Sequence, residues 1–454
     1  MLFDFAMPED KIKGELYKTL YLKIKEAAEC GAIKTGEKLP SVREAAAQLG
    51  VSRTTIENAY TRLCIEGIAE SKPQKGYFIT ENNNFKKETV KPKKEEYEVK
   101  YDFSSRNIDT SAADTELWKR IMRSVLWDST QLTSYGEKMG EQRLREALED
   151  YSYKARGVKA SSDNIVIGAG IGPLLNILCG IMGRKIVVGI ENGGFAAAES
   201  VFSDYGIHTV ILDSDANGAT VKSIEENKID VLFLLPSALS KISVSALNNR
   251  RNEYIKWAGE RENRFIIEDD YNGELRYTAR TVTSFQGKFP EKTVYIGSFS
   301  KLLLPSVRIA YMVLPPDLSE KLRKREIAYN QTCGKIEQLA LADYIERGAL
   351  EKHLRRLRRI YYNKSQILIR ELNSFIPDSE IKLYESSLMI ELQLDIGISS
   401  KEISETALKN GIRLIETKKN GAVRLCFAGI SETDISCAVK SLNFCIEELK
   451  KRCV

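Results

Sequence analysis

The chain has only two histidines, His208 and His353, and none of its eight cysteines belongs to a Cys-x-x-Cys pair. A structural zinc site needs four clustered ligands, so this composition argues against a metal and favours buried thiols. Long apolar runs are also missing: stretches such as 229–235 fall well short of the about 20 residues that span a bilayer. Acidic residues at positions 4, 9 and 10 argue against a secretory signal. We therefore expect a cytoplasmic protein.

The length and charge of the chain set further bounds. At 454 residues it exceeds one ordinary core, so two or three structural units are expected. Hydrophobic residues make up 43% and charged residues 29%, which is typical of a globular protein. The formal net charge of +5 is compatible with nucleic-acid binding but does not by itself indicate it.

One segment differs sharply in composition from the rest. Residues 81–100 (ENNNFKKETVKPKKEEYEVK) are polar and nearly free of large aliphatic side chains. Such a segment buries too little apolar area to offset the entropy of ordering, which predicts a linker. We therefore expect a domain at residues 1–80 and a body at 101–454. In the body, strand-like runs alternate with helical patterns, as in an α/β fold.

The first 80 residues carry the signals of a winged helix-turn-helix. Ser41 and Glu44 form a capping-box pattern ahead of a helix at 42–49, which ends at Gly50. A second helix follows to about residue 66, so the order is helix, glycine turn, helix. Predicted strands at 68–71 and 77–80 flank a basic tip, residues 72–76, that would act as a wing on the DNA backbone.

Residues 15–80 resemble the DNA-binding domain of the GntR family, most closely in LPSVREAAAQLGVSRTTIENAYTRLCIEGI. The resemblance implies contacts with double-stranded DNA from Arg43, Ser52, Arg53, Thr54 and Gly76. Glu57 stands where some members of the family carry arginine. The alternative is a three-helix domain with a hairpin whose charges are merely solvated.

The body contains a set of residues suited to pyridoxal phosphate. A short strand at 293–296 leads to Ser298, Ser300 and Lys301, and Arg308 follows seven residues later. A lysine amine forms a Schiff base with the aldehyde of this cofactor, while hydroxyls and a planar guanidinium hold its phosphate.

Two upstream elements strengthen this interpretation. An apolar strand at 265–268 ends in Asp269, Asp270 and Tyr271. A carboxylate there keeps the pyridine nitrogen protonated, and a phenol hydrogen-bonds the 3-oxygen of the ring. Earlier still, a strand at 165–168 passes through small residues into a helix, whose first backbone N–H groups make an anion site.

From about Tyr101 onward the chain resembles the MocR branch of GntR regulators, whose bodies descend from fold type I aminotransferases. The similarity is densest in SYGEKMGEQRLREALEDYSYKARGV, IIEDDYNGELRY, VYIGSFSKLLLPSVRIAYMVLP, EQLALADYIERGALEKHLRRLRRIY and VRLCFAGIS. It implies a large mixed or parallel sheet domain with a smaller α+β domain. It also makes Lys301 the Schiff-base lysine, pairs Asp269 with the pyridine nitrogen and places Tyr271 at the 3-oxygen.

The resemblance implies further contacts in the same site. The phosphate ligands are Ser298, Ser300, Arg308 and the backbone amides of Ala169, Gly170 and Ile171. Phe195 would stack on the ring, and Tyr135 would reach the phosphate of the other subunit in a head-to-tail homodimer. Arg424 would bind the carboxylate of an effector, or else form a salt bridge.

The pocket lining departs from the usual pattern of the family. Gly193–Ala197 replaces a Pro-Gly-Tyr segment followed by arginine, and 236–243 replaces Pro-Ser-His-Gln-Phe-Pro-x-Gly. Arg106 stands at the edge of the effector pocket where glycine is common. The cofactor anchors are thus kept while the surroundings change, which indicates an altered effector.

Three functions remain open. The favoured one is a transcription regulator in which an amino acid or amine displaces Lys301 by forming an external aldimine, and domain closure alters DNA binding. An active aminotransferase with an attached DNA-binding domain is the second, and weak transaminase half-reactions fit either. The third is a body that serves only for dimerisation and has lost its cofactor. The sequence leaves open the effector, the operator, and whether the protein activates or represses.

Overall fold

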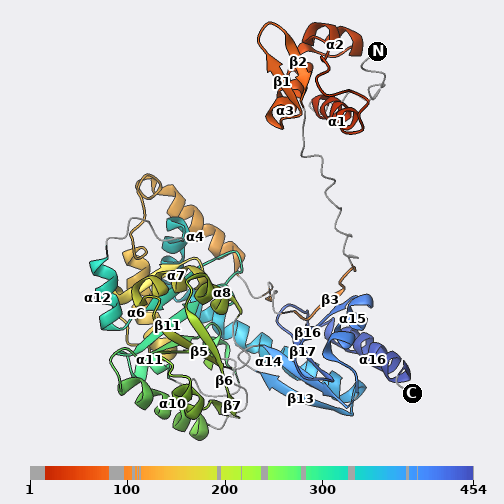
Figure 1. Cartoon of the computed structure of the whole chain (residues 1–454). Coiled ribbons are helices and arrows are strands. Elements are labelled where there is room, and N and C mark those ends of the chain that lie inside the picture. Colours follow the sequence, from red (N-terminus) through yellow and green to blue (C-terminus); the bar gives the residue numbers. More distant parts are fainter. Residues whose placement is uncertain are drawn as a thin grey trace. The chain divides into compact units, whose positions relative to one another are not determined.

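In the computed structural model of the protein, the described residues are 16–80, 97–104, 108–109, 111, 114–191, 196–215, 217–236, 244–277, 283–325, 333–384, 388–395 and 397–452. The chain divides into two compact units, residues 1–96 and 97–454, here called the head and the body. Each unit is described by itself (Figure 1). No helix among the described residues is long and apolar enough to cross a membrane.

The head is a winged helix-turn-helix, as predicted. Its elements are α1 (Leu16–Glu29), α2 (Val42–Leu49), α3 (Arg53–Ile65), β1 (Ala69–Lys72) and β2 (Gly76–Ile79). The capping box of Ser41 and Glu44 is present, and Gly50 ends α2 in the left-handed conformation. Apolar side chains from all three helices and both strands, among them Leu20, Ile56 and Ile79, form one buried core.

The body is built on a seven-stranded sheet in the order β4-β12-β11-β10-β9-β5-β6. The strands are β4 (Ile165–Gly168), β5 (Val187–Glu191), β6 (His208–Leu212), β9 (Val231–Leu234), β10 (Phe265–Asp269), β11 (Thr293–Ser298) and β12 (Ala310–Val313). Strand β12 pairs antiparallel with both its neighbours, while the other pairs are parallel. Runs such as VLFL in β9 are buried throughout, because parallel strands are covered on both faces.

Helices cover this sheet (Figure 1). They are α4 (Thr115–Trp127), α5 (Ser129–Leu132), α6 (Gln142–Arg156), α7 (Ile171–Met182), α8 (Ala196–Asp204), α9 (Val221–Glu226), α10 (Val244–Gly259), α11 (Phe285–Lys288), α12 (Pro316–Lys324) and α13 (Lys335–Glu346). Two short 3-10 helices, η2 (Ser162–Asn164) and η4 (Gly273–Leu275), and a small ribbon of β7 (Ser214–Asp215) and β8 (Gly218–Ala219) complete this part.

The long helix α14 (Ala349–Phe375) leads to a smaller α+β domain (Figure 1). Its four-stranded sheet has the order β13-β14-β17-β16, from β13 (Ser379–Tyr384), β14 (Met389–Leu394), β16 (Ile415–Glu416) and β17 (Ala422–Cys426). Helices α15 (Ser400–Lys409) and α16 (Ile435–Arg452) belong to it, and β3 (Tyr101–Asp102) pairs with β15 (Ile412–Arg413). The predicted division into a large mixed sheet and a smaller α+β domain is confirmed.

The expectation of buried thiols is met only in part. Cys179, Cys333, Cys426 and Cys445 are buried, but Cys30 and Cys437 are exposed. Cys30 directly follows the last residue of α1, where it packs less tightly than the helix interior.

Candidate functional site

In the head, four of the five predicted DNA contacts lie at exposed positions, and the fifth, Gly76, is half-buried. Arg43 is in α2, Arg53 and Thr54 open α3, and Ser52 precedes them as the N-cap residue. The hydroxyl of Ser52 accepts a hydrogen bond from the backbone N–H of Thr55 at 3.1 Å. Ser52 therefore also stabilises the start of the helix that carries Arg53.

The turn between β1 and β2 has the geometry of a tight wing. The backbone N–H of Lys75 donates to the carbonyl of Lys72 at 3.0 Å. Gly76 has φ of +102°, and a Cβ there would lie 3.2 Å from Cε of Lys38. Glycine therefore fits this position because of both its backbone angle and its close neighbour. Lys72 and Lys75 are exposed on the tip.

In the body, the glycine loop after β4 approaches Arg308. Gly170 has φ of +106°, and a Cβ at this position would lie 3.0 Å from Nη2 of Arg308. Helix α7 begins directly after Gly170 without a side-chain cap. The first backbone N–H groups of a helix attract anions, so a helix start beside a guanidinium is suited to bind an anion.

The two serines after β11 reach the same place. Nη1 of Arg308 donates to Oγ of Ser300 at 3.0 Å, and the N–H of Ser300 lies 3.4 Å from Oγ of Ser298. Ser298 pairs with Ala310 of β12, and Ala310 pairs with Gly168 of β4. The sheet thus brings Ser298, Ser300 and Arg308 next to the glycine loop of the same chain.

Lys301 follows on the same loop and is largely buried. Burial lowers the pKa of its amine, while Cys426 and Asp269 act in the opposite direction. Its Nζ lies 5.2 Å from the centre of the Tyr271 ring. A lysine with a lowered pKa is more often unprotonated at neutral pH, which is the form that attacks a carbonyl carbon.

The structure separates the roles of the two neighbouring aspartates. Burial and, to a smaller extent, the charge of Asp270 raise the pKa of Asp269 to about 8, while Lys301 acts in the opposite direction. Asp270 instead accepts a hydrogen bond from Nε of Arg156 at 2.5 Å and from the hydroxyl of Tyr295 at 3.2 Å. Asp270 is therefore paired with Arg156, whereas Asp269 is the carboxyl group whose charge acts on Lys301.

A buried group of charges around Asp270 was missed from the sequence. Glu268 lies 3.6 Å from Arg251, and Glu274 accepts a hydrogen bond from Tyr151 at 3.3 Å. Burial raises the pKa of both glutamates to about 7. The run of three acidic residues that ends a buried strand was a signal, but their partners come from distant segments.

Arg424, the predicted effector ligand, is paired with an acidic residue of the neighbouring strand. Its Nε donates to Oε2 of Glu391 at 2.8 Å, and its guanidinium lies 5.2 Å from the ring centre of Tyr384. The salt bridge that the sequence left as an alternative is therefore present. Cys426, two residues along β17, is buried and interacts with Lys301, so this strand borders the lysine.

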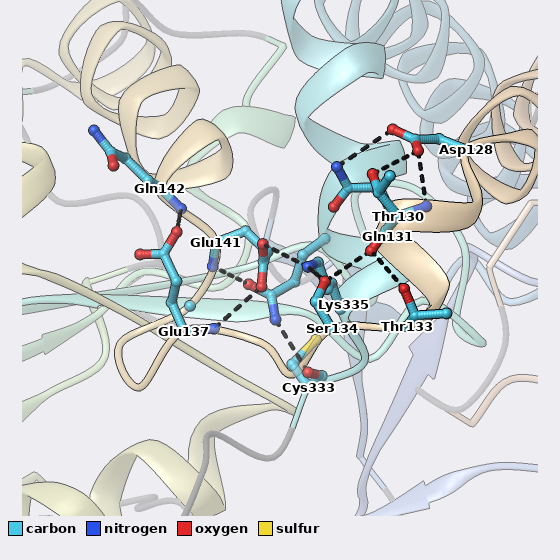
Figure 2. Close-up of polar contacts among 12 residues, drawn as sticks. Asp128, Thr130, Gln131, Thr133, Ser134, Glu137, Glu141, Gln142, Cys333 and Lys335 are labelled. Atoms are coloured by element: carbon cyan, nitrogen blue, oxygen red, sulfur yellow. Dashed lines mark hydrogen bonds and ion pairs between the residues drawn. The ribbon is translucent and has the colours of Figure 1, made fainter.

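Tyr135, predicted to act in the other subunit, is 92% exposed in this chain. It lies between α5 and α6, next to a cluster of polar contacts that links Ser134, Glu141 and Lys335 (Figure 2). Phe195 and Arg106, the remaining predicted residues, fall outside the described residues, as does residue 240 in the altered segment.

Residues 16–79 match the family model described as "Bacterial regulatory proteins, gntR family". The HTH-type transcriptional regulator YdeL of Bacillus subtilis is 35% identical over 94% of this chain and 96% of its own length. The rhizopine catabolism regulatory protein MocR of Rhizobium meliloti is 26% identical over 78% of this chain and 76% of its own. A kynurenine aminotransferase structure from Pyrococcus horikoshii, in complex with PMP, superimposes with a TM-score of 0.66 at 24% identity, covering 77% of this chain and 91% of the other.

Proposed function

Because this chain belongs to the MocR branch of the GntR family of bacterial transcription regulators, we propose that its body holds pyridoxal phosphate at Lys301 and senses an amino compound. The DNA-binding head, the aminotransferase-like body and the regulatory role follow from the family. We propose the cofactor, the effector, the homodimer and the individual contacts. We also propose that the chain divides into a domain at residues 1–80, a linker at 81–100 and a body at 101–454.

One observation carries the cofactor proposal: a site suited to an anion lies one residue from a largely buried lysine amine. Gly170 at the start of α7, Ser300 and Arg308 form the anion site, and Lys301 follows Ser300 directly. The donor set suits a phosphate monoester, because backbone N–H groups, a hydroxyl and a guanidinium all donate. A Cβ at residue 170 would fill part of the space, so the glycine keeps the cradle open.

The remaining residues fit the ring of the same cofactor. Bound there, pyridoxal phosphate supplies an electrophilic carbon that links covalently to amines. In cofactor-free protein, the pKa of about 8 keeps Asp269 mostly protonated near neutral pH. A protonated ring nitrogen beside it would instead stabilise the carboxylate form. Tyr271, whose ring centre lies 5.2 Å from Nζ of Lys301, is proposed to donate a hydrogen bond to the 3-oxygen. Phe195 is proposed to stack on the ring.

Sensing would proceed by exchange of amines at Lys301. The lowered pKa of this lysine favours the neutral amine, the form that would link to the cofactor and would be released when another amine takes its place. Arg424 binds the carboxylate of an amino acid effector, and Arg106 lies at the edge of the same pocket. An effector changes DNA binding only by as much as it favours one body conformation over the other.

The DNA-bound form is proposed to be a head-to-tail homodimer in the cytoplasm. Arg43, Ser52, Arg53 and Thr54 contact the operator, and Gly76 shapes the wing. Tyr135 is exposed on its own chain and supplies a phosphate ligand to the partner subunit. The body retains Lys301 and Asp269, so slow transaminase half-reactions are compatible with it, but we propose that steady turnover is not its role.

Two measurements test the proposal on the full-length protein. Borohydride reduction of the purified protein should fix the cofactor to Lys301, which peptide mass spectrometry detects. A titration of operator DNA with and without amino acids and amines should reveal at least one ligand that changes the affinity. A protein that binds no pyridoxal phosphate when supplied with it would overturn the cofactor proposal. Steady keto-acid production with DNA affinity indifferent to the same ligand would instead favour an aminotransferase.

A further inference from the structure

The segment that carries Tyr135 is short and largely exposed, yet hydrogen bonds tie it to the body. Residues 133–141 connect α5 to α6, and Tyr135 is 92% exposed within them. An exposed loop of this kind normally samples many conformations, and fixing a residue in it has an entropic cost. A residue that already holds the loop in the bound geometry would lower that cost.

Lys335, the first residue of α13, makes the connection (Figure 2). Its Nζ donates to Oγ of Ser134 at 2.7 Å, on the residue directly before Tyr135. The same Nζ lies 3.9 Å from Oε2 of Glu141, and the two side chains are only 15% and 9% exposed. Ser134 also donates to the carbonyl of Thr130 at 2.9 Å, so the hydroxyl joins α5 to the lysine.

A hydrogen bond to a buried glutamine holds Glu141, the acidic partner of Lys335, in place. The buried side chain of Gln338, one turn along α13, accepts a hydrogen bond from the N–H of Glu141 at 2.8 Å. Its amide nitrogen donates to the carbonyl of Cys333 at 3.0 Å. The carboxylate of Glu141 in turn accepts from the N–H of Glu137 at 3.2 Å, on the far side of Tyr135. Ser134 is therefore linked to α13 directly through Lys335, and Glu137 is linked to it through Glu141 (Figure 2).

We propose that Lys335 is a positioning residue that holds the Tyr135 segment in place for the partner subunit, so that each subunit's Lys335 sets the cofactor affinity of the other subunit. This inference rests on the proposed function, in which Tyr135 completes the partner's phosphate site. Lys335 acts through Ser134 and the backbone, not by touching the cofactor. Lys335 is only 15% exposed, and a charge-assisted hydrogen bond from its amine to Ser134 is strong enough to matter for a loop of this length.

Hybrid dimers of the full-length chain test this directly. Two differently tagged chains are co-expressed and the mixed dimers isolated, with Lys301→Ala in one chain so that only one site can be fixed by borohydride. When Lys335→Met is on the Lys301→Ala chain, the intact site in the other chain should bind pyridoxal phosphate about five- to tenfold more weakly. When Lys335→Met is on the chain with the intact site, affinity should equal that of the hybrid carrying Lys301→Ala alone. Equal weakening in both arrangements, or in neither, overturns the proposal.

Two further variants separate positioning from other roles. Ser134→Ala removes the other partner of the same hydrogen bond without changing the charge of the chain. In homodimers it should weaken cofactor binding to a similar degree. Combining it with Lys335→Met should add little. If Lys335 bound the partner's phosphate itself, Ser134→Ala would leave the affinity unchanged. Lys324→Met, which removes an exposed lysine paired with Glu320, is the matched control and should have no effect.

A readout without cofactor keeps the inference distinct from the proposed function. In cofactor-free protein, Lys335→Met should speed hydrogen–deuterium exchange in residues 129–137 and leave α14 unchanged. Unchanged exchange in that segment would contradict the tether. If wild-type protein binds no cofactor while exchange does respond, the proposed function fails and the tether stands. If wild-type protein binds cofactor and the hybrids do not differ, only the inference fails.

Discussion

Arg424 of β17 and Glu391 of β14 lie opposite one another in the small sheet, with Nε of the arginine donating to the carboxylate over 2.8 Å. The Tyr384 hydroxyl lies 3.4 Å from the same carboxylate oxygen. Glu391 thus holds one edge of the guanidinium and offsets its charge. Among the described residues, Glu391 is the acidic partner of this arginine, so a ligand carboxylate would meet the terminal nitrogens.

Arg424→Gln should reduce the response to amino acid effectors at least tenfold, because the ion pair between the arginine and the carboxylate of the effector is lost. Amines without a carboxylate should respond as they do with wild-type protein. Glu391→Gln, the matched variant, keeps the shape but removes the offsetting charge, so carboxylate effectors should bind more tightly. All three expectations are tested by titrating each effector and measuring the affinity of the protein for operator DNA. An Arg424→Gln protein with unchanged response would remove this arginine from the effector site.

Lys301→Ala should bind pyridoxal phosphate without any linkage that borohydride can fix, because no amine remains beside the anion site. The phosphate contacts of Ser300 and Arg308 should persist, so weaker, reversible binding is expected. Equilibrium dialysis and intact mass after reduction separate the two effects. Covalent trapping at another lysine would show that Lys301 is wrongly assigned.

Asp269→Asn should stabilise the cofactor-free protein in a pH-dependent way. Burial raises the folded-state pKa of Asp269 from its ordinary 3.8 to about 8. The folded protein therefore keeps a proton that the unfolded chain loses, and the free energy of unfolding falls as pH rises toward 8. The advantage of the variant should grow between about pH 4 and about pH 8, then level off, at roughly 1.4 kcal/mol per pKa unit.

Urea unfolding at several pH values measures this effect, with the exposed Asp150→Asn as control. The same Asp269→Asn variant should bind cofactor more weakly, since a neutral amide does not hold a protonated ring nitrogen. Stability and cofactor affinity thus move in opposite directions. A stability advantage that is flat in pH would contradict burial of an ionisable carboxyl group at this position.

Arg53→Ala should weaken operator binding by about 1–3 kcal/mol if the arginine reads a base edge at the start of α3. Arg62→Ala is the matched control on the same helix, where the arginine pairs with Glu66 at 3.4 Å. Affinities over a range of salt concentrations distinguish base reading from phosphate contact. Loss of a phosphate contact would lower the salt slope by about one unit and weaken all sequences alike.

The head was predictable because its signals are local. Ser41, Glu44 and Gly50 specify a helix and its two ends within ten residues, and the structure has the capping box and the left-handed glycine where the sequence indicates them. The strands before Asp269 and Lys301 were predictable for the same reason, since short apolar runs between polar ends read as buried strands.

Contacts between distant segments could not be predicted without the fold. The separation in sequence between Arg156 and Asp270, or between Ser134 and Lys335, leaves no periodic signal. From the residues alone, Asp269 and Asp270 were equally good candidates for the carboxylate at the ring nitrogen, and only the family resemblance selected Asp269. Their difference lies in burial and in Arg156, which are properties of the packed interior. Glu391 was missed because a pair across two strands requires their register.

Strand β12 has a consequence for how the chain tolerates insertions and deletions. Ala310 pairs with Gly168 on one side and Ser298 on the other, so this strand separates the two walls of the phosphate cradle by two strand spacings, about 9.5 Å. Deleting one residue between Lys301 and Ile309 would shift the register of β12 and turn the side chains of this strand to the opposite faces of the sheet. Apart from Arg308, selection on this stretch should therefore act on its length more strictly than on its composition. A library of substitutions that spares Arg308 should yield folded, cofactor-binding variants where a library of single deletions does not.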